Sequence, residues 1–292
     1  MNYFSFFFRK KIIITAFSVS GFTLIAIWLY FNYFLFGHNS GFLQNYKLID
    51  GPLNIADTAQ QSSGLAYNPD NNLLYVIVNN PPQIHILSSS GKYIRRIDLK
   101  GFEDTEGITY IGNNKFAIIS ERTAMLSWFR ILPDTTIINY DPDRAVKILN
   151  YPPGNTGIEG ISYAAKTGQI FVIKERKPKK IAALQWPVKN IKQPVITIPW
   201  DAEALPNKFL RSLSGISYNN KTGHLFILSR RSRQIIEYTL SGIEVGSFSL
   251  KIGSGKLQAP IKKAEGIVIS PDGTLYICGE SNQLYIFKKR SI

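Results

Sequence analysis

Glu106-Gly107-Ile108 is one of five short, glycine-centred signatures that recur along this chain of 292 residues. The other four are Ser63-Gly64-Leu65, Glu159-Gly160-Ile161, Ser214-Gly215-Ile216 and Glu265-Gly266-Ile267. Successive signatures lie 43, 53, 55 and 51 residues apart. This period is close to the length of a four-stranded propeller blade and far from that of helical or leucine-rich repeats. The sequence therefore predicts an all-β protein, a β-propeller with five blades.

Each signature is followed by a turn and an apolar run, which predicts a β-hairpin in every repeat. A polar or charged residue ends each run, 15 or 16 residues after the start of its signature; these are Asn79, Glu121, Glu175, Arg230 and Glu280. The two ends of a hairpin meet, and the first strand of a propeller blade lines the central channel. We therefore expect these five side chains at one mouth of the channel, together with Ser63, Glu106, Glu159, Ser214 and Glu265.

The fifth repeat supplies only three strands before Ile292. An extended segment, Asn45 to Ile55, precedes the first repeat and is expected to provide the missing outer strand, which closes the ring and removes its open edge. Residues 37–45 are then a tether and residues 46–292 the propeller. A sixth blade within the insertions Leu132 to Pro153 or Pro187 to Arg211 is the alternative, because divergent repeats escape notice.

The N-terminal part predicts a membrane anchor. Residues 12–36 form a stretch of 25 residues without a charge, long enough for a helix to cross a bilayer, and Arg9, Lys10 and Lys11 precede it. By the positive-inside rule, residues 1–11 are cytoplasmic and the propeller lies in the periplasm, on the outer side of a bacterial inner (plasma) membrane. A cleaved signal peptide is the other interpretation, which the length of the apolar run disfavours.

The chain is cationic, with 34 Lys and Arg against 20 Asp and Glu and a formal net charge of +14. Such a surface favours an anionic component of the cell envelope as partner, although a merely solvated face explains the charge equally well. No nucleic-acid recognition module is evident, so nucleic acid is disfavoured. The single cysteine, Cys278, lies in an apolar run, and we expect its side chain to be buried as a small apolar group of the core. The oligomeric state cannot be read from the sequence.

With the repeats laid out, the chain resembles the SdiA-regulated family of bacterial proteins. The motifs that carry the resemblance are Ser63 to Pro69, Asn79 to Ile84, Gly101 to Ile108, Leu213 to Tyr218 and Ala264 to Ile267. The resemblance implies a membrane-anchored periplasmic β-propeller without an established reaction. This chain departs from the family where Arg230 replaces a commonly acidic residue and where Gly279-Glu280-Ser281-Asn282 replaces Ser-Glu-Pro-Asn.

Six glutamates at one mouth require compensation of their charge. Ca²⁺ held by Glu106, Glu159 and Glu265 is one solution, because calcium prefers six to eight oxygen ligands. Pairing with Arg230, Arg122 and Arg176, or sharing of protons, are the others. The glutamates can also serve only to accept backbone N–H groups of the next blade and so hold the ring together.

Two functions follow from this site. The first is binding of a small ligand, an ion or an envelope partner without catalysis, with Ser63, Asn79, Glu121, Glu175, Ser214, Arg230 and Glu280 as ligand contacts. The alternative is a calcium-dependent hydrolase of an ester, lactone or phosphate, in which the metal lowers the pKa of bound water. Binding is favoured, since none of the three histidines is placed by its spacing to act as a base beside the metal.

Overall fold

The computed structural model describes residues 23–28, 40–56, 61–148, 157–175, 178–188, 192, 194–199, 211–280 and 282–289. The chain divides into two compact units, residues 1–38 and 39–292. In the first unit, residues 23–28 are helical. Among the described residues no helix has the length and apolar character to cross a membrane, and most of the predicted 12–36 anchor lies outside them.

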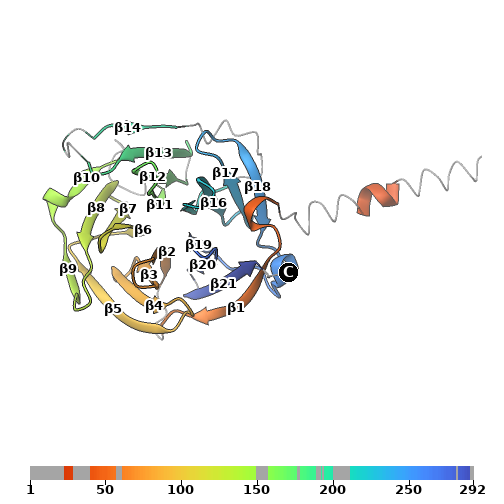
Figure 1. The fold of residues 1–292 in the computed structure, drawn as a ribbon, viewed down its shortest axis with the longest axis horizontal. Coiled ribbons are helices and arrows are strands. Elements are labelled where there is room, and N and C mark those ends of the chain that lie inside the picture. Colours follow the sequence, from red (N-terminus) through yellow and green to blue (C-terminus); the bar gives the residue numbers. More distant parts are fainter. Residues whose placement is uncertain are drawn as a thin grey trace, which may run out of the picture. The chain divides into compact units, whose positions relative to one another are not determined.

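The second unit is a ring of five antiparallel sheets, seen in Figure 1 along the ring axis. Blade 1 consists of β2 (Ser62–Asn68), β3 (Leu73–Val78), β4 (Gln83–Ser88) and β5 (Tyr93–Lys100). Blade 2 consists of β6 (Thr105–Gly112), β7 (Lys115–Ser120), β8 (Met125–Arg130) and β10 (Ala145–Lys147). Blade 3 consists of β11 (Ile158–Ala164), β12 (Gln169–Lys174), β13 (Lys180–Gln185) and β14 (Ile196–Thr197).

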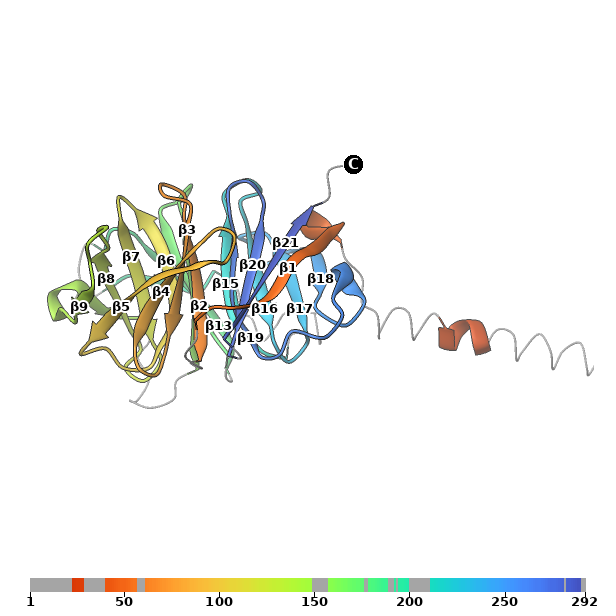
Figure 2. The ribbon, with the colours of Figure 1, turned by 90° about the horizontal axis from the view of Figure 1, so that it is seen from below.

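Blade 4 consists of β15 (Gly215–Asn219), β16 (His224–Ser229), β17 (Gln234–Tyr238) and β18 (Glu244–Ser249). Blade 5 consists of β19 (Ala264–Ile269), β20 (Leu275–Gly279), β21 (Gln283–Lys289) and, from the other end of the chain, β1 (Tyr46–Asn54). β1 pairs antiparallel with β21, from Tyr46 opposite Lys289 to Asn54 opposite Gln283. Figure 2 shows these two strands side by side. The predicted five blades and the predicted closure by the N-terminal strand are confirmed.

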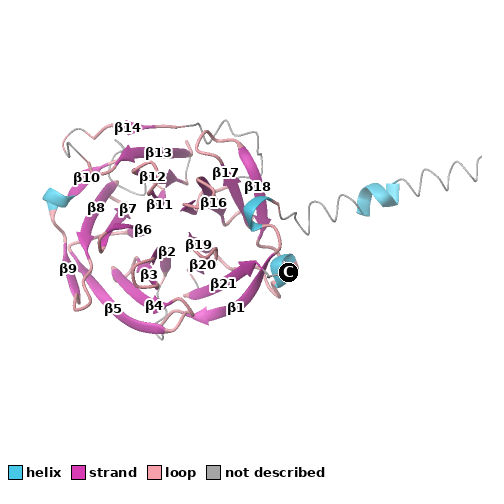
Figure 3. Ribbon diagram, in the orientation of Figure 1, coloured by secondary structure: helices cyan, strands magenta, loops and turns pink. Residues whose placement is uncertain are grey.

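The first long insertion does not form a sixth blade. Its strand β9 (Ile137–Asn139) pairs parallel with β5 at the outer edge of blade 1, and the chain then passes through a short 3₁₀ helix, Pro142–Arg144, into β10 of blade 2. The insertion therefore ties two neighbouring blades together. In the second insertion β14 pairs with β13, while residues 200–210 lie outside the described residues. Apart from three short 3₁₀ turns, the described part of the ring is built of strands (Figure 3).

A separate hydrophobic cluster fills each of the five interfaces between neighbouring blades. The cluster between blades 5 and 1 contains Leu74 and Val76 from β3 together with Tyr276 and Cys278 from β20. Cys278 is fully buried there, as its sequence context predicts. Because blade 5 packs on blade 1 in the same manner as the other pairs, the ring is closed by a core as well as by β1.

The glycine of the signature allows the inner strands to approach one another around the axis. A Cβ placed on Gly64 would lie 2.8 Å from the carbonyl oxygen of Glu106 and from the Cα of Gly107 in the next blade. Such distances are below van der Waals contact, so a larger side chain would force the blades apart. The packing of five inner strands around one narrow channel therefore requires the recurring glycine.

Candidate functional site

Hydrogen bonds join the two ends of each inner hairpin at one rim of the propeller. In blade 2 the backbone N–H of Glu121 donates to the carbonyl oxygen of Asp104 at 2.8 Å, and in blade 3 that of Glu175 donates to Gly157 at 2.5 Å. Blades 1 and 5 repeat the bond, from Asn79 to Gln61 at 3.3 Å and from Glu280 to Lys263 at 3.1 Å. In blade 4 the N–H of Arg230 donates instead to Ser214 Oγ at 3.1 Å. The signature residues and the hairpin ends therefore share one mouth of the channel.

Arg230 is the internal counter-ion of one half of this mouth. Its guanidinium donates to Glu175 Oε2 of blade 3 at 3.1 Å and to Glu280 Oε1 of blade 5 at 3.4 Å, and it forms an ion pair with Glu265. Burial opposes the charge of the guanidinium, but Glu265 and Glu175 outweigh this and raise the pKa of Arg230. Lys263 also pairs with Glu280. Three acidic side chains from two blades thus share the guanidinium of a residue in the blade between them.

This compensation is incomplete. Glu175 and Glu265 are buried, with 6% and 5% of their surfaces exposed, and Arg230 contacts one oxygen of each. The second oxygens, Glu175 Oε1 and Glu265 Oε2, have no hydrogen-bond partner among the residues that the structure describes. Burial raises the pKa of Glu265 to about 9 even though Arg230 acts in the opposite direction. Buried carboxylate oxygens without partners are costly, so this region gains stability from any added positive charge or proton.

A second acidic group lies on the other side of the mouth, at the entry and exit of the inner hairpin of blade 2. Asp104, Glu106 and Glu121 each bring a carboxylate oxygen to within 4.8 Å of the others. Asn79 Nδ2 donates to Asp104 Oδ1 at 3.0 Å and to Glu106 Oε1 at 2.6 Å, and Glu121 Oε1 accepts from the N–H of Gly157 at 2.5 Å. Arg122 makes an ion pair with this group, with 3.9 Å between its Nε and Asp104 Oδ2.

The acidic group of blade 2 shifts the titration of its own members. Burial raises the pKa of Glu106 to about 9, and the negative charges of Glu159, Asp104 and Glu121 act in the same direction. The hydroxyl of Ser63 opposes the shift by hydrogen bonding to the carboxylate. Glu159, which lines the channel with Glu265, raises the pKa of both Glu106 and Glu265 and so lies electrostatically between the two halves. A divalent cation among these oxygens would replace the proton.

All ten residues selected from the sequence lie at this mouth, but they group differently from the prediction. Of the three predicted metal ligands, Glu106 belongs to the carboxylate group with metal-ligand spacing, Glu265 is paired with Arg230, and Glu159 lines the channel and raises the pKa of both. Sequence reasoning missed Asp104 because it lies before the repeated signature. Its backbone is left-handed, with a φ of 52°, and the hydrogen bond from Glu121 fixes it beside the hairpin end. The acid two residues before Glu106 was the available signal. Of the other predicted counter-ions, Arg176 is outside the described residues.

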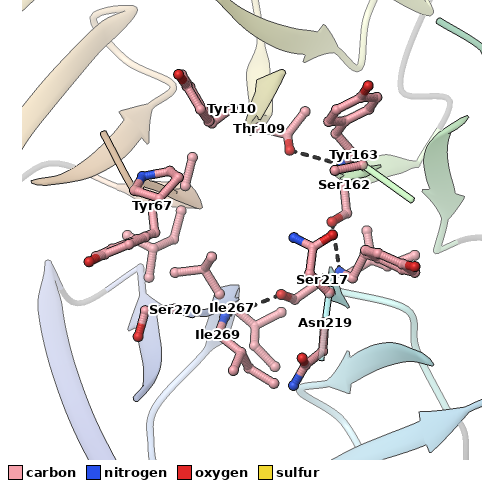
Figure 4. Close-up of a pocket in the computed structure, with 18 of the residues that line it drawn as sticks. Tyr67, Thr109, Tyr110, Ser162, Tyr163, Ser217, Asn219, Ile267, Ile269 and Ser270 are labelled. Atoms are coloured by element: carbon pink, nitrogen blue, oxygen red, sulfur yellow. Dashed lines mark hydrogen bonds between the residues drawn. The ribbon is translucent and has the colours of Figure 1, made fainter. Parts of the chain in front are cut away.

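The opposite mouth of the channel is a small cup of about 200 Å³. Tyr67, Tyr110, Tyr163 and Tyr218 surround it, one from each of blades 1 to 4, and Figure 4 labels the first three. Hydroxyls within the cup accept backbone N–H groups of the following blade: Thr109 from Tyr163 at 3.0 Å, Ser162 from Tyr218 at 2.8 Å and Ser217 from Ile269 at 3.3 Å. These hydroxyls therefore link neighbouring blades at the second mouth of the channel.

The two histidines that the structure describes lie away from the acidic mouth. His85 is buried in β4, with its Nε2 3.2 Å from Gln83 Oε1. His224 begins β16, and its Nδ1 is 2.8 Å from Glu237 Oε1 in β17. Glu237 also accepts the N–H of Phe42 at 2.7 Å, which attaches the segment before β1 to blade 4. Both histidines therefore serve the structure of their blades.

Comparison with known structures supports the fold. Over 76% of this chain and 73% of the other, the structure is similar to a chain of a nidogen/laminin complex, with a TM-score of 0.50 and 12% sequence identity. It is also similar to a glutaminyl cyclase from Myxococcus xanthus over 83% of this chain and 95% of that chain, with a TM-score of 0.50 and 15% identity. At such identities the likeness concerns the fold alone. The sequence model of the SdiA-regulated family matches residues 38–288, nearly the whole propeller with its closing strand, and the chain therefore belongs to the SdiA-regulated family.

Proposed function

We propose that this protein is a binding propeller whose acidic mouth takes a divalent cation, Ca²⁺, at Asp104, Glu106 and Glu121. The observation that carries the proposal is the convergence of three carboxylate oxygens to within 4.8 Å of one another. Carboxylate oxygens are the ligands that calcium prefers, and its coordination shell has room for carbonyl groups and water as well. A side-chain flip would add the amide oxygen of Asn79, whose nitrogen now lies 3.0 Å from Asp104 and 2.6 Å from Glu106.

Binding is favoured over hydrolysis by the placement of the side chains at the mouth. A metal-dependent hydrolase needs a base in reach of the metal-bound water. Both described histidines lie in blade strands away from the mouth, and Arg230 occupies three of the remaining carboxylates. The propeller therefore acts as a receptor for an ion, a small ligand or an envelope partner rather than as an enzyme.

Calcium is expected to raise the melting temperature of the full-length protein relative to EDTA. A ligand that binds only the folded state stabilises it by about 2.7 kcal/mol at roughly 100 times its dissociation constant. Asp104→Asn and Glu121→Gln are expected to abolish the shift, whereas Asp134→Asn, a change of the same charge on an exposed turn, preserves it. Differential scanning calorimetry measures the effect. An unchanged melting temperature in the unsubstituted protein would remove calcium from the account.

We propose further that residues 12–36 anchor the protein in the bacterial inner membrane and that the propeller lies in the periplasm. The support is the uncharged stretch of 25 residues after Arg9, Lys10 and Lys11. A reporter that is active only in the periplasm, fused after Ile292, is expected to be active, and the fusion is expected to sediment with membranes. Replacing residues 12–36 by a cleavable signal peptide should release an active fusion into the soluble fraction. A cytoplasmic fusion would contradict this location.

The positive charge of the chain supports one more part of the proposal, an anionic component of the envelope as partner. A surface with a large excess of Lys and Arg attracts polyanions over distances of about 10 Å at 0.1 M salt. In this proposal the acidic mouth binds a cation, and the cationic surface binds an anionic partner.

A further inference from the structure

A groove of about 670 Å³ opens beside the acidic mouth, at the rim of blades 4, 5 and 1. One wall is the turn between β16 and β17, with Arg230, Arg231 and Arg233, and the other is the segment before β19, with Lys262 and Lys263. Ala259, Pro260 and Ile261 add an apolar surface, and Gln61 closes the end next to blade 1. The volume falls within the range of roughly 300–1,000 Å³ that is typical of small-molecule sites.

The groove carries a concentrated positive charge that the neighbouring carboxylates compensate only in part. Among the residues that the structure describes, Glu280 is the one acidic residue of the lining, and it is already paired with Lys263 and with Arg230. Arg231, Arg233 and Lys262 make no ion pair with any residue that the structure describes. Like charges within a Debye length repel one another and together attract an anion.

The backbone holds both cationic walls in place. In the arginine turn, the N–H groups of Arg230 and Arg231 donate to Ser214 Oγ at 3.1 Å and Ser212 Oγ at 3.2 Å. The carbonyl oxygen of Arg233 accepts the N–H of Leu250 at 2.8 Å. A ligand therefore meets a wall whose backbone is already ordered, which lowers the entropic cost of binding.

The lysine segment is packed equally closely on blade 5. A Cβ added to Gly279 would lie 2.6 Å from the carbonyl oxygen of Lys262 and 2.8 Å from that of Lys263. The N–H of Glu280 donates to Lys263 at 3.1 Å. The glycine at the end of β20 thus allows the segment to lie against the blade and to face the arginine turn.

We propose that this groove binds a phosphate group, carried either by a small soluble ligand or by the headgroup of a phospholipid. Guanidinium groups match the geometry of phosphate oxygens and bind them through paired, charge-assisted hydrogen bonds, and lysines add point charges. The apolar residues of the groove accommodate the organic part of the ligand. This proposal makes the proposed anionic envelope partner more specific. It rests on that earlier proposal only in that the ligand is negatively charged.

Isothermal titration of the full-length protein with pyrophosphate and with glycerol 3-phosphate, both in EDTA, tests the soluble source. Flotation with phosphatidylcholine vesicles that contain or lack phosphatidylglycerol tests the lipid source. The double variant Arg231→Ala/Arg233→Ala removes two charges from the groove. Its matched control, Lys100→Ala/Lys147→Ala, removes two exposed charges from the outer strands β5 and β10.

We expect binding in at least one arm, weakened about tenfold or more by the arginine variant and less than about twofold by the lysine variant. Binding of glycerol 3-phosphate or pyrophosphate assigns a soluble ligand, and binding only of the anionic vesicles assigns the headgroup. Equal losses in the two variants would overturn the groove while leaving the attraction of the whole surface for polyanions intact. The absence of binding in every arm would overturn both.

Discussion

Replacing Arg230 by leucine is expected to lower the free energy of unfolding by about 3 kcal/mol at pH 8. Removing one member of a buried ion pair costs about 3–5 kcal/mol because it leaves a buried charge uncompensated, and the lower end applies here since 27% of the Arg230 side chain is exposed. Glu175 and Glu265 would both lose their counter-ion.

Chemical denaturation at pH 8 measures the effect. Arg231→Leu is the matched control, since it removes the same charge one residue along the same turn, where the side chain is exposed and makes no ion pair with described residues. We expect its effect to stay below about 0.5 kcal/mol. A similar loss in the two variants would show that the guanidinium does not hold the acidic mouth together.

Glu106→Gln is expected to stabilise the calcium-free protein increasingly as the pH rises from 5 to 8. The folded state holds the proton of Glu106 up to a pKa of about 9, whereas the unfolded chain loses it near 4.5. Between these values the folded state binds more protons, so its stability falls with rising pH, by up to about 1.4 kcal/mol per pH unit. The stability that the protonated Glu106 contributes to the unsubstituted protein is complete below pH 4.5 and lost above about pH 9. Glutamine cannot ionise and escapes the loss.

The measurement is the free energy of unfolding in EDTA at several pH values, for the unsubstituted protein and for the variant. The two curves should nearly meet at pH 5 and separate by about 4 kcal/mol at pH 8, as an upper bound. Glu103→Gln, which changes an exposed carboxyl three residues earlier, should run parallel to the unsubstituted protein. Parallel curves for Glu106→Gln as well would mean that Glu106 is ionised and well solvated at neutral pH.

The sequence predicted the blades and their closure because these features repeat. The five signatures lie where a Cβ would clash with the next blade, as at Gly64, so the number of recurring glycines gives the number of blades. The addition of β9 to blade 1 was not predictable. Its three residues pair in parallel with β5, on a blade that the chain had already left, and nothing in Ile137–Asn139 indicates that partner. Tertiary contact alone selects this edge.

The position of the site at one mouth of the channel was predicted, but the ion pairs and hydrogen bonds between its side chains were not. Hairpin geometry places Asn79, Glu121 and Glu280 at one rim because the two ends of a hairpin meet. The choice of partners depends on distances between blades, which the spacing of repeats does not give. Arg230 thus contacts both neighbouring blades, and Asp104 joins the group through a left-handed backbone position outside the repeat. The charges of the side chains and their positions along the hairpins could be predicted from the sequence. The contacts across the channel could be found only from the structure.

A crystal structure of the full-length protein grown with calcium is the most direct test of the acidic mouth. We expect an electron-density peak for Ca²⁺ about 2.3–2.6 Å from carboxylate oxygens of Asp104, Glu106 and Glu121. The peak should lie at the rim that also holds Arg230 paired with Glu265. A mouth in which these three carboxylates hold only protons or water at saturating calcium would contradict the central claim.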